Sequence, residues 1–174
     1  MRQWGFPVPA DELVAVEQAA AAFRDLWASI RPPWPHAFDG SVNDVRAIDY
    51  LHYEGIGFPK CGVEGAALVC GEVLRRAARL EWVCSYRGDW FVASPEDDWP
   101  GVAICPVVRV HEVQFAGTPQ FGRFMWFLSR AAIDCVPVAS ADAEADLRKL
   151  LVFGDEYVQH LGRTINELPG AKDK

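Results

Sequence analysis

Residues 81–93 read EWVCSYRGDWFVA, and this segment indicates a β-hairpin. In its first half every second residue is aromatic or cysteine, which places these side chains on one side of a strand. The triplet Arg87-Gly88-Asp89 is typical of a compact turn, and residues 90–93 are strand-forming residues. We therefore predict two antiparallel strands joined by a turn, and we do not interpret the triplet as an adhesion motif.

Two further strands are expected after the hairpin. Residues 94–101 are dense in Ser, Pro, Asp and Gly, as a loop between strands would be. Residues 102–105 predict a third strand, which Pro106 ends, because proline has no N–H to donate to a sheet. Residues 107–115 predict a fourth and longer strand. Together these segments predict a four-stranded, mainly antiparallel meander.

Helices are expected before these strands. Apolar residues recur every three or four positions over residues 11–30, which predicts a helix with Asp11 as its N-terminal cap. A short helix over residues 44–53 and a third helix over about residues 63–80 follow. Two glycines weaken the third helix by about 1 kcal/mol each relative to alanine. We therefore expect this helix to pack closely against a sheet or another helix.

The C-terminal part of the sequence also predicts helices. Residues 120–133 are apolar around most of a helical circumference, which is typical of a central helix or of an interface such as that of a homodimer. Helices over residues 140–153 and 155–166 follow, and residues 169–174 are expected to fray. We therefore predict an α+β fold, in which the C-terminal helices pack on the sheet. Residues 1–168 are expected to form one domain.

The composition narrows the possible classes of protein. Half of the 174 residues (51%) are hydrophobic, which is enough to form a core. There are 17 basic and 24 acidic residues, and the net charge of −7 argues against nucleic acid as a partner and is compatible with a basic protein. No apolar run reaches the roughly 18 residues of a membrane span. Without an export signal, the five scattered cysteines predict a cytoplasmic protein with reduced thiols.

Motifs for metal, cofactor or phosphate binding are not found in the sequence. The four histidines are solitary and the cysteines are widely spaced, whereas metal ligands cluster at short spacing. Cys61 is the best candidate for a nucleophile, because Lys60 and the start of a helix lie beside it and both lower a thiol pKa. A packing role is the favoured interpretation of Cys61. We therefore expect no cofactor and no metal, and a binding protein rather than an enzyme.

An acidic loop between the second and third strands is the candidate binding surface. Three consecutive carboxylates in it lie near another in the hairpin turn, and tryptophans flank the set. The cluster could be a solvated loop, a cation site or a pair of acid–base carboxylates. It would also suit a basic partner, because tryptophan is enriched in binding hot spots. The residues expected to contact a partner are Asp89, Trp90, Glu96, Asp97, Asp98 and Trp99.

Part of the sequence resembles a group of small bacterial proteins. Residues 65–74 read GAALVCGEVL, and they are followed by LEWV at residues 80–83 and ICP at residues 104–106. This pattern is similar to proteins of unknown function in which a G-x-x-L-x-x-G-E-x-L helix leads into a strand with tryptophan, some of them associated with toxin–immunity loci. The resemblance covers residues 63–110 and implies a non-catalytic binding protein. It transfers no active-site residues.

Three functional hypotheses follow. The first is an immunity protein, similar to an antitoxin, that neutralises a bacterial toxin by direct binding. The second is a small-ligand-binding protein or a thiol-dependent enzyme, with a pocket between the sheet and the helix at residues 120–133. The third is a structural subunit that forms a homodimer through the same helix.

Overall fold

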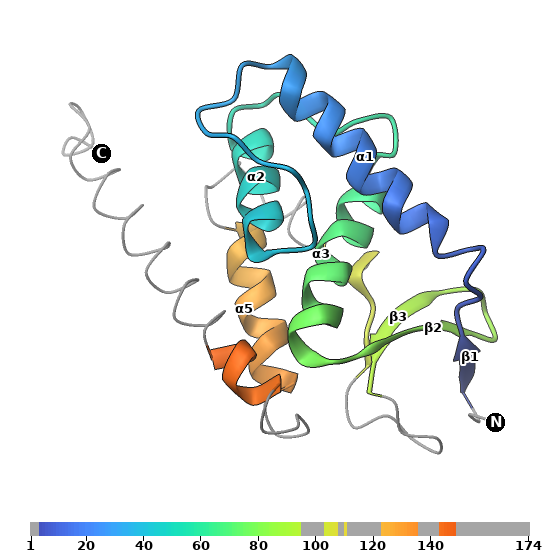
Figure 1. Cartoon of the computed structure of the whole chain (residues 1–174). Helices are drawn as coiled ribbons and strands as arrows, with labels where there is room; N and C mark the ends of the chain where they lie inside the picture. Colours follow the sequence, from blue (N-terminus) through green and yellow to red (C-terminus); the bar gives the residue numbers. More distant parts are fainter. Residues whose placement is uncertain (1–3, 95–102, 108–109, 111–122, 136–142, 149–174) are drawn as a thin grey trace, which may run out of the picture.

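The computed structural model of the chain describes residues 4–94, 103–107, 110, 123–135 and 143–148. It has an antiparallel sheet at one side and helices at the other (Figure 1). Helix α3 (Gly62–Ala78) lies in the middle and contacts α1 (Val14–Ser29), α2 (Val42–Tyr53), α5 (Arg123–Cys135) and the sheet. This arrangement confirms the predicted α+β class and the predicted close packing of the third helix.

The sheet contains four strands in the order β1-β2-β3-β4, and every neighbouring pair is antiparallel. Strands β2 (Glu81–Ser85) and β3 (Trp90–Ala93) form the predicted hairpin. Its turn is closed by the Ser85 N–H, which donates to the Asp89 carbonyl oxygen at 2.8 Å. Gly88 adopts φ +90°, a left-handed conformation that glycine enters without steric cost.

One of the four predicted strands is wrong. The fourth strand of the sheet is β1 (Gly5–Pro7), which pairs with β2, and the third predicted strand is confirmed as the short β4 (Ala103–Ile104). Pro106, Val107 and Val110, which were expected to end a strand and to begin the next, are helical. Proline fits the first turn of a helix, where no N–H is needed, so Pro106 begins a helix here. The rest of the expected strand lies outside the described residues.

The predicted helices are confirmed in the described residues, with one difference at the start of α1. The first helix begins at Val14 instead of Asp11, because residues 9–13 form a separate turn in which the Leu13 N–H donates to the Pro9 carbonyl oxygen at 3.1 Å. Asp11 is therefore not the N-terminal cap. Residues 143–148 are helical, as expected. The helix predicted at residues 155–166, the tail and the end of the predicted domain lie outside the described residues.

The core lies between the three N-terminal helices, α5 and the sheet. Phe23 and Trp27 of α1 are almost completely buried, as is Phe38 from the segment that joins α1 to α2. Phe124 at the start of α5 is also buried, and its backbone N–H donates to the carboxylate of Asp49 on α2 at 2.9 Å. Phe124 and Leu128 are therefore buried in the core of the chain itself. A homodimer through α5 would need other side chains, and it stays a prediction.

Candidate functional site

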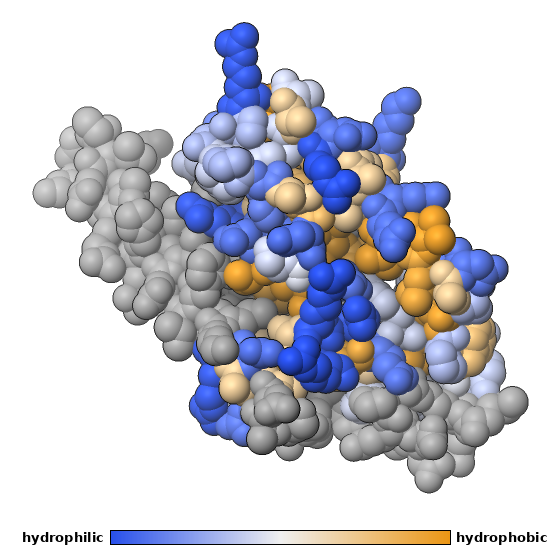
Figure 2. Space-filling model, viewed as in Figure 1, coloured by the Kyte–Doolittle hydropathy of each residue, from blue (hydrophilic) through white to orange (hydrophobic). Residues whose placement is uncertain are grey.

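An open groove lies between α1, α3, the segment 38–44, the end of β1 and the beginning of β2. Its volume is about 900 Å³. On the face seen in Figure 2, hydrophobic residues lie next to strongly hydrophilic ones over these elements. The lining residues that matter for its chemistry are Val8, Leu13, Val16, Glu17, Arg24, Phe38, Asp39, Glu72, Arg75, Arg76, Glu81 and Trp82.

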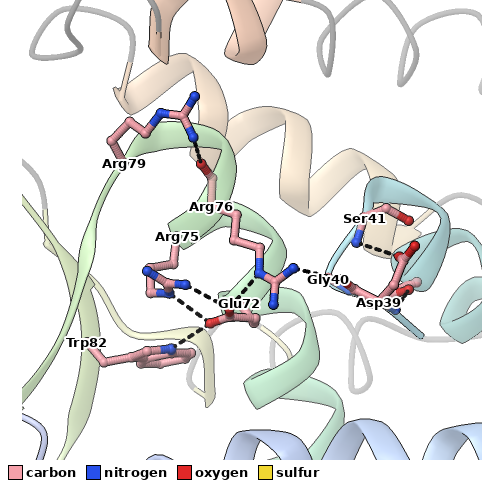
Figure 3. A network of polar contacts seen from close by, with 9 residues as sticks. Asp39, Gly40, Ser41, Glu72, Arg75, Arg76, Arg79 and Trp82 are labelled. Carbon is pink, nitrogen blue, oxygen red and sulfur yellow. Dashed lines mark hydrogen bonds and ion pairs between the residues drawn. The ribbon is translucent and has the colours of Figure 1, made fainter. Parts of the chain in front are cut away.

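The carboxylate of Glu72 organises one wall of this groove (Figure 3). It accepts two hydrogen bonds from Arg75, both at 2.8 Å, one from the Nε–H of Arg76 at 2.7 Å, and one from the indole N–H of Trp82 at 3.0 Å. The arginines lie three and four residues after Glu72, the spacing at which helical side chains meet. Trp82 reaches it because β2 follows α3 after a short turn.

The electrostatics of Glu72 follow from these contacts. Burial by itself would raise the pKa of the carboxyl group, but the hydrogen bonds from Arg75, Arg76 and Trp82 outweigh burial and lower the pKa to about 2. The same contact with Glu72 raises the pKa of Arg75 above its ordinary value. Glu72 is therefore ionised throughout the physiological range, and it holds two guanidinium groups in fixed positions.

Acid is expected to destabilise the protein partly through Glu72. The pKa of Glu72 falls from 4.5 to about 2 on folding, so its contribution is complete above pH 4.5 and is lost as the pH falls through about 2. After a discount for solvent screening, this contribution is about 1–2 kcal/mol. Urea unfolding of the wild type and Glu72→Gln at pH 7 and pH 3 should show a smaller pH dependence in the variant. Glu64→Gln, at an exposed position, is the control. Equal pH dependence of the wild type and Glu72→Gln would contradict this assignment.

The segment between α1 and α2 holds two of the groove arginines at one end. Arg24 donates to the carbonyl oxygens of Ala37 and Phe38 at 2.7 and 3.3 Å, and Arg76 donates to that of Asp39 at 2.7 Å. The two guanidinium groups therefore bind three consecutive carbonyls. Gly40, with φ +83°, makes room for this, since a Cβ there would lie 2.6 Å from Cζ of Arg76.

Asp44 fixes the shape of the same segment. It is 1% exposed, and its carboxylate accepts the backbone N–H groups of Gly40 at 2.8 Å and Asp39 at 3.2 Å. His36 Nε2 lies 2.6 Å from Asp44 Oδ1. Asp44 is the third residue of α2, and its carboxylate reaches back past the start of the helix to the backbone of the preceding segment. The arginine-binding carbonyls are thus held by α2.

The structure describes only some of the residues that were predicted to contact a partner. Asp89 is exposed in the hairpin turn, and Trp90 is half-buried against Trp82, with ring centroids 5.9 Å apart. Glu96, Asp97, Asp98 and Trp99, however, lie outside the described residues. The structure therefore places Asp89 and Trp90 beside each other at the hairpin end of the sheet, and the predicted acidic loop stays a prediction.

Two aromatic residues that the sequence analysis did not select lie beside Asp89 and Trp90. Phe6 on β1 is opposite Cys84 in the sheet register, and Trp90 is opposite Cys84 on the other side, so these side chains share one face of the sheet. Tyr86 lies against Phe6, with ring centroids 6.2 Å apart. Phe6 is 41% exposed and Tyr86 is 61% exposed. We call Phe6, Tyr86 and Trp90 the aromatic patch.

Two carboxylates act on Cys84, which lies between Phe6 and Trp90 in the sheet register. Burial raises the pKa of the Cys84 thiol, and the negative charges of Glu12 and Asp89 raise it further. Glu12 comes from the turn before α1, and Asp89 comes from the hairpin turn. Two segments far apart in the sequence therefore contribute negative charge that reaches the same face of the sheet.

Cys61 does not have the electrostatic environment expected of a nucleophile. It is half-buried directly before α3, and burial raises the pKa of its thiol, with Glu64 adding to the increase. The expected lowering of its pKa by Lys60 and the helix start is therefore wrong, and this argues against a reactive thiolate. All five cysteines are free, and Cys70, Cys84 and Cys135 are buried, as expected for reduced packing residues.

The fold and these surfaces define an α+β protein with an open charged groove and an exposed aromatic patch. No family model, no curated protein and no solved structure matches the chain. In the described part of the chain, no three His, Cys, Asp or Glu side chains are grouped so that they could hold a metal ion. No helix among the described residues is long and apolar enough to cross a membrane. The predicted pocket between the sheet and residues 120–133 stays a prediction, since the groove lies elsewhere.

Proposed function

We propose that the protein is a non-catalytic protein-binding module that acts as an immunity protein, neutralising a basic bacterial toxin by direct contact. A cytoplasmic location is part of the same proposal. The observation that carries it is the aromatic patch, in which Phe6 and Tyr86 are exposed side by side next to Trp90. Exposed aromatic side chains on a rigid sheet are the residue type that contributes most to protein–protein affinity.

The charge of the surface indicates the kind of partner. The charges of Glu12 and Asp89 act on Cys84, which lies between Phe6 and Trp90 in the sheet, and the whole chain carries a net charge of −7. Complementary charge steers association and penalises partners of the same sign, so a basic protein is favoured. Apolar anchors surrounded by charged groups also match the usual anatomy of an interface, with a buried core and a polar rim. The resemblance of residues 63–110 to proteins of toxin–immunity loci supports the same function.

Tyr86→Ser is expected to weaken binding of the partner by about 30-fold, because loss of a hot-spot tyrosine costs about 2 kcal/mol. Tagged wild type would be purified from the organism that encodes it, and a co-purifying basic protein would be quantified against Tyr86→Ser and Asp89→Lys. Tyr53→Ser is the matched control, because Tyr53 is also an exposed tyrosine, at 41%, but lies on α2, outside the patch.

The outcome decides whether the aromatic patch is the interface with a toxin. A stoichiometric partner that is retained by Tyr53→Ser, lost from Tyr86→Ser and toxic when produced alone supports the immunity function. Equal recovery of the partner with all variants would show that the aromatic patch is not the interface. Recovery of no basic protein from cells that produce the chain at its natural level would refute the proposal.

A further inference from the structure

The groove arginines have hydrogen-bond donors that the fold does not use. Arg24 uses Nε and Nη2, Arg75 uses Nε and Nη2, and Arg76 uses Nε and Nη1. Among the residues that the structure describes, the Nη1 group of Arg24, the Nη1 group of Arg75 and the Nη2 group of Arg76 have no hydrogen-bond partner. All three side chains line the same groove, so this wall offers several N–H groups to a ligand.

These donors are held in place before any ligand arrives. Glu72 fixes Arg75 and Arg76, and the Asp39 carbonyl oxygen also fixes Arg76 (Figure 3). The carbonyl oxygens of Ala37 and Phe38 fix Arg24. Glu72 already accepts four hydrogen bonds, so its carboxylate is saturated by the fold. A planar guanidinium group in a fixed position favours a carboxylate, which it can bind through two parallel N–H donors.

The remaining wall of the groove is apolar. Val8, Val16 and Trp82 are buried residues that reach the groove surface, and Leu13 and Phe38 complete this wall. A volume of about 900 Å³ is within the range of sites that bind small organic molecules. The groove therefore combines an apolar surface with donors concentrated at one end.

Carboxylates on the rim set the direction of a ligand. Glu17 lies two helical turns before Arg24 on α1, about 10 Å away along the helix, and it is exposed. Glu81 begins β2, and it is also exposed. Asp39 also lies at the arginine end, where its carboxylate accepts the Ser41 N–H at 3.0 Å and keeps its negative charge. An anionic group therefore gains hydrogen bonds from Arg24 and Arg76 and is disfavoured beside Glu17.

We propose that this groove binds an organic carboxylate with an apolar body, with the carboxylate against Arg24 and Arg76 and the body extended toward Trp82. The groove shares no lining residue with the aromatic patch, although Trp82 contacts Trp90, and it does not depend on the proposed immunity function. The ligand class is defined by one negative charge and a hydrocarbon or aromatic body of modest size.

Three probes with one body and different charge test the proposal. These are 4-phenylbutyrate, 4-phenylbutylamine and 4-phenylbutanol, titrated into the full chain by calorimetry and by NMR of the Trp82 indole N–H, assigned with Trp82→Phe. Phenylbutyrate is expected to bind with a dissociation constant of about 1 mM, as its size allows, and to shift the Trp82 signal. The amine and the alcohol are expected to bind at least tenfold more weakly.

Variants separate binding in the groove from general effects on folding. Arg24→Gln and Arg76→Gln should each weaken phenylbutyrate binding about tenfold. Arg79→Gln is the matched control, because Arg79 lies one turn after Arg75 but pairs with Asp146 outside the groove. Glu17→Gln should tighten binding about twofold, a gain that loss of folded protein cannot produce.

Either of two results would overturn the proposal. One is no binding of phenylbutyrate at 10 mM to chain that is folded by circular dichroism. The other is binding that is unchanged in Arg76→Gln and Arg24→Gln or that is matched by the amine. Neither result would bear on the aromatic patch, since the groove variants leave Phe6, Tyr86 and Trp90 unchanged.

Discussion

Trp27→Ala is expected to lower the free energy of unfolding by about 4 kcal/mol, the largest effect of any single substitution considered for this chain. Trp27 is 2% exposed and lies at the centre of an aromatic cluster, within 5.0 Å of Trp34 and 5.6 Å of Tyr50 between ring centroids. Its indole N–H also donates to the Trp34 carbonyl oxygen at 3.1 Å. Alanine would remove these contacts together and leave a cavity between α1, α2 and the segment that joins them.

Urea unfolding at pH 7 measures this effect. Trp27→Phe should cost less than half as much, because it keeps an aromatic ring in the cluster and loses the indole hydrogen bond. Tyr86→Ala is the exposed counterpart, and it should change stability by no more than about 0.5 kcal/mol, since Tyr86 is 61% exposed. A loss below about 2 kcal/mol for Trp27→Ala would show that the cluster collapses around the missing ring.

The sequence predicts those parts of the fold whose signal is local. The hairpin at residues 81–93 shows alternation and turn residues within a few positions, and both strands and the turn are confirmed. The apolar repeat of the first helix likewise identifies Val16, Phe23 and Trp27 as its buried face. In these elements the local conformational preference and the tertiary packing agree, so reading the sequence is enough.

Strand β1 shows why the rest of the sheet could not be predicted. It has three residues, ends with a proline, and pairs with β2, whose residues are far away in the sequence. Three residues cannot establish an alternating pattern, and the pairing is decided by tertiary contacts. The strand predicted at residues 107–115 failed in its described residues for the same reason, because strand propensity there is overridden by context.

The groove could not be predicted from the sequence either, although the spacing of some of its charged residues can be recognised there. Glu72, Arg75 and Arg76 are spaced as a helical ion-pair set, but arginines in the last turn of a helix are equally well explained by the helix dipole, which favours cations there. Arg24 joins them only because the segment after α1 folds back over it. No local sequence pattern predicts that contact. Of the three residues of the aromatic patch, the sequence analysis selected only Trp90, and Phe6 was missed together with its strand.

The sequence predicts close packing at Gly71, and the structure identifies the residue that packs against it. A Cβ at Gly71 would collide with Cη2 of Trp82 and lie 2.9 Å from both Cζ2 of Trp82 and Cγ of Pro106. The indole cannot retreat easily, because its N–H is hydrogen-bonded to Glu72. The glycine therefore permits the contact between α3 and β2 that also shapes the groove wall.

Gly71→Ala is expected to destabilise the protein by about 3 kcal/mol, even though alanine is the better helix former by about 1 kcal/mol. The cause can be tested by relieving the clash. In a Trp82→Phe background, where the outer indole ring is absent, the same Gly71→Ala change should cost less than about 1 kcal/mol, and the difference is the coupling energy of a double-mutant cycle measured by urea unfolding. A cost that is independent of Trp82 would show that Pro106 or the helix itself sets the requirement for glycine. Stabilisation by Gly71→Ala in the wild-type background would mean that α3 and β2 are further apart than the structure places them.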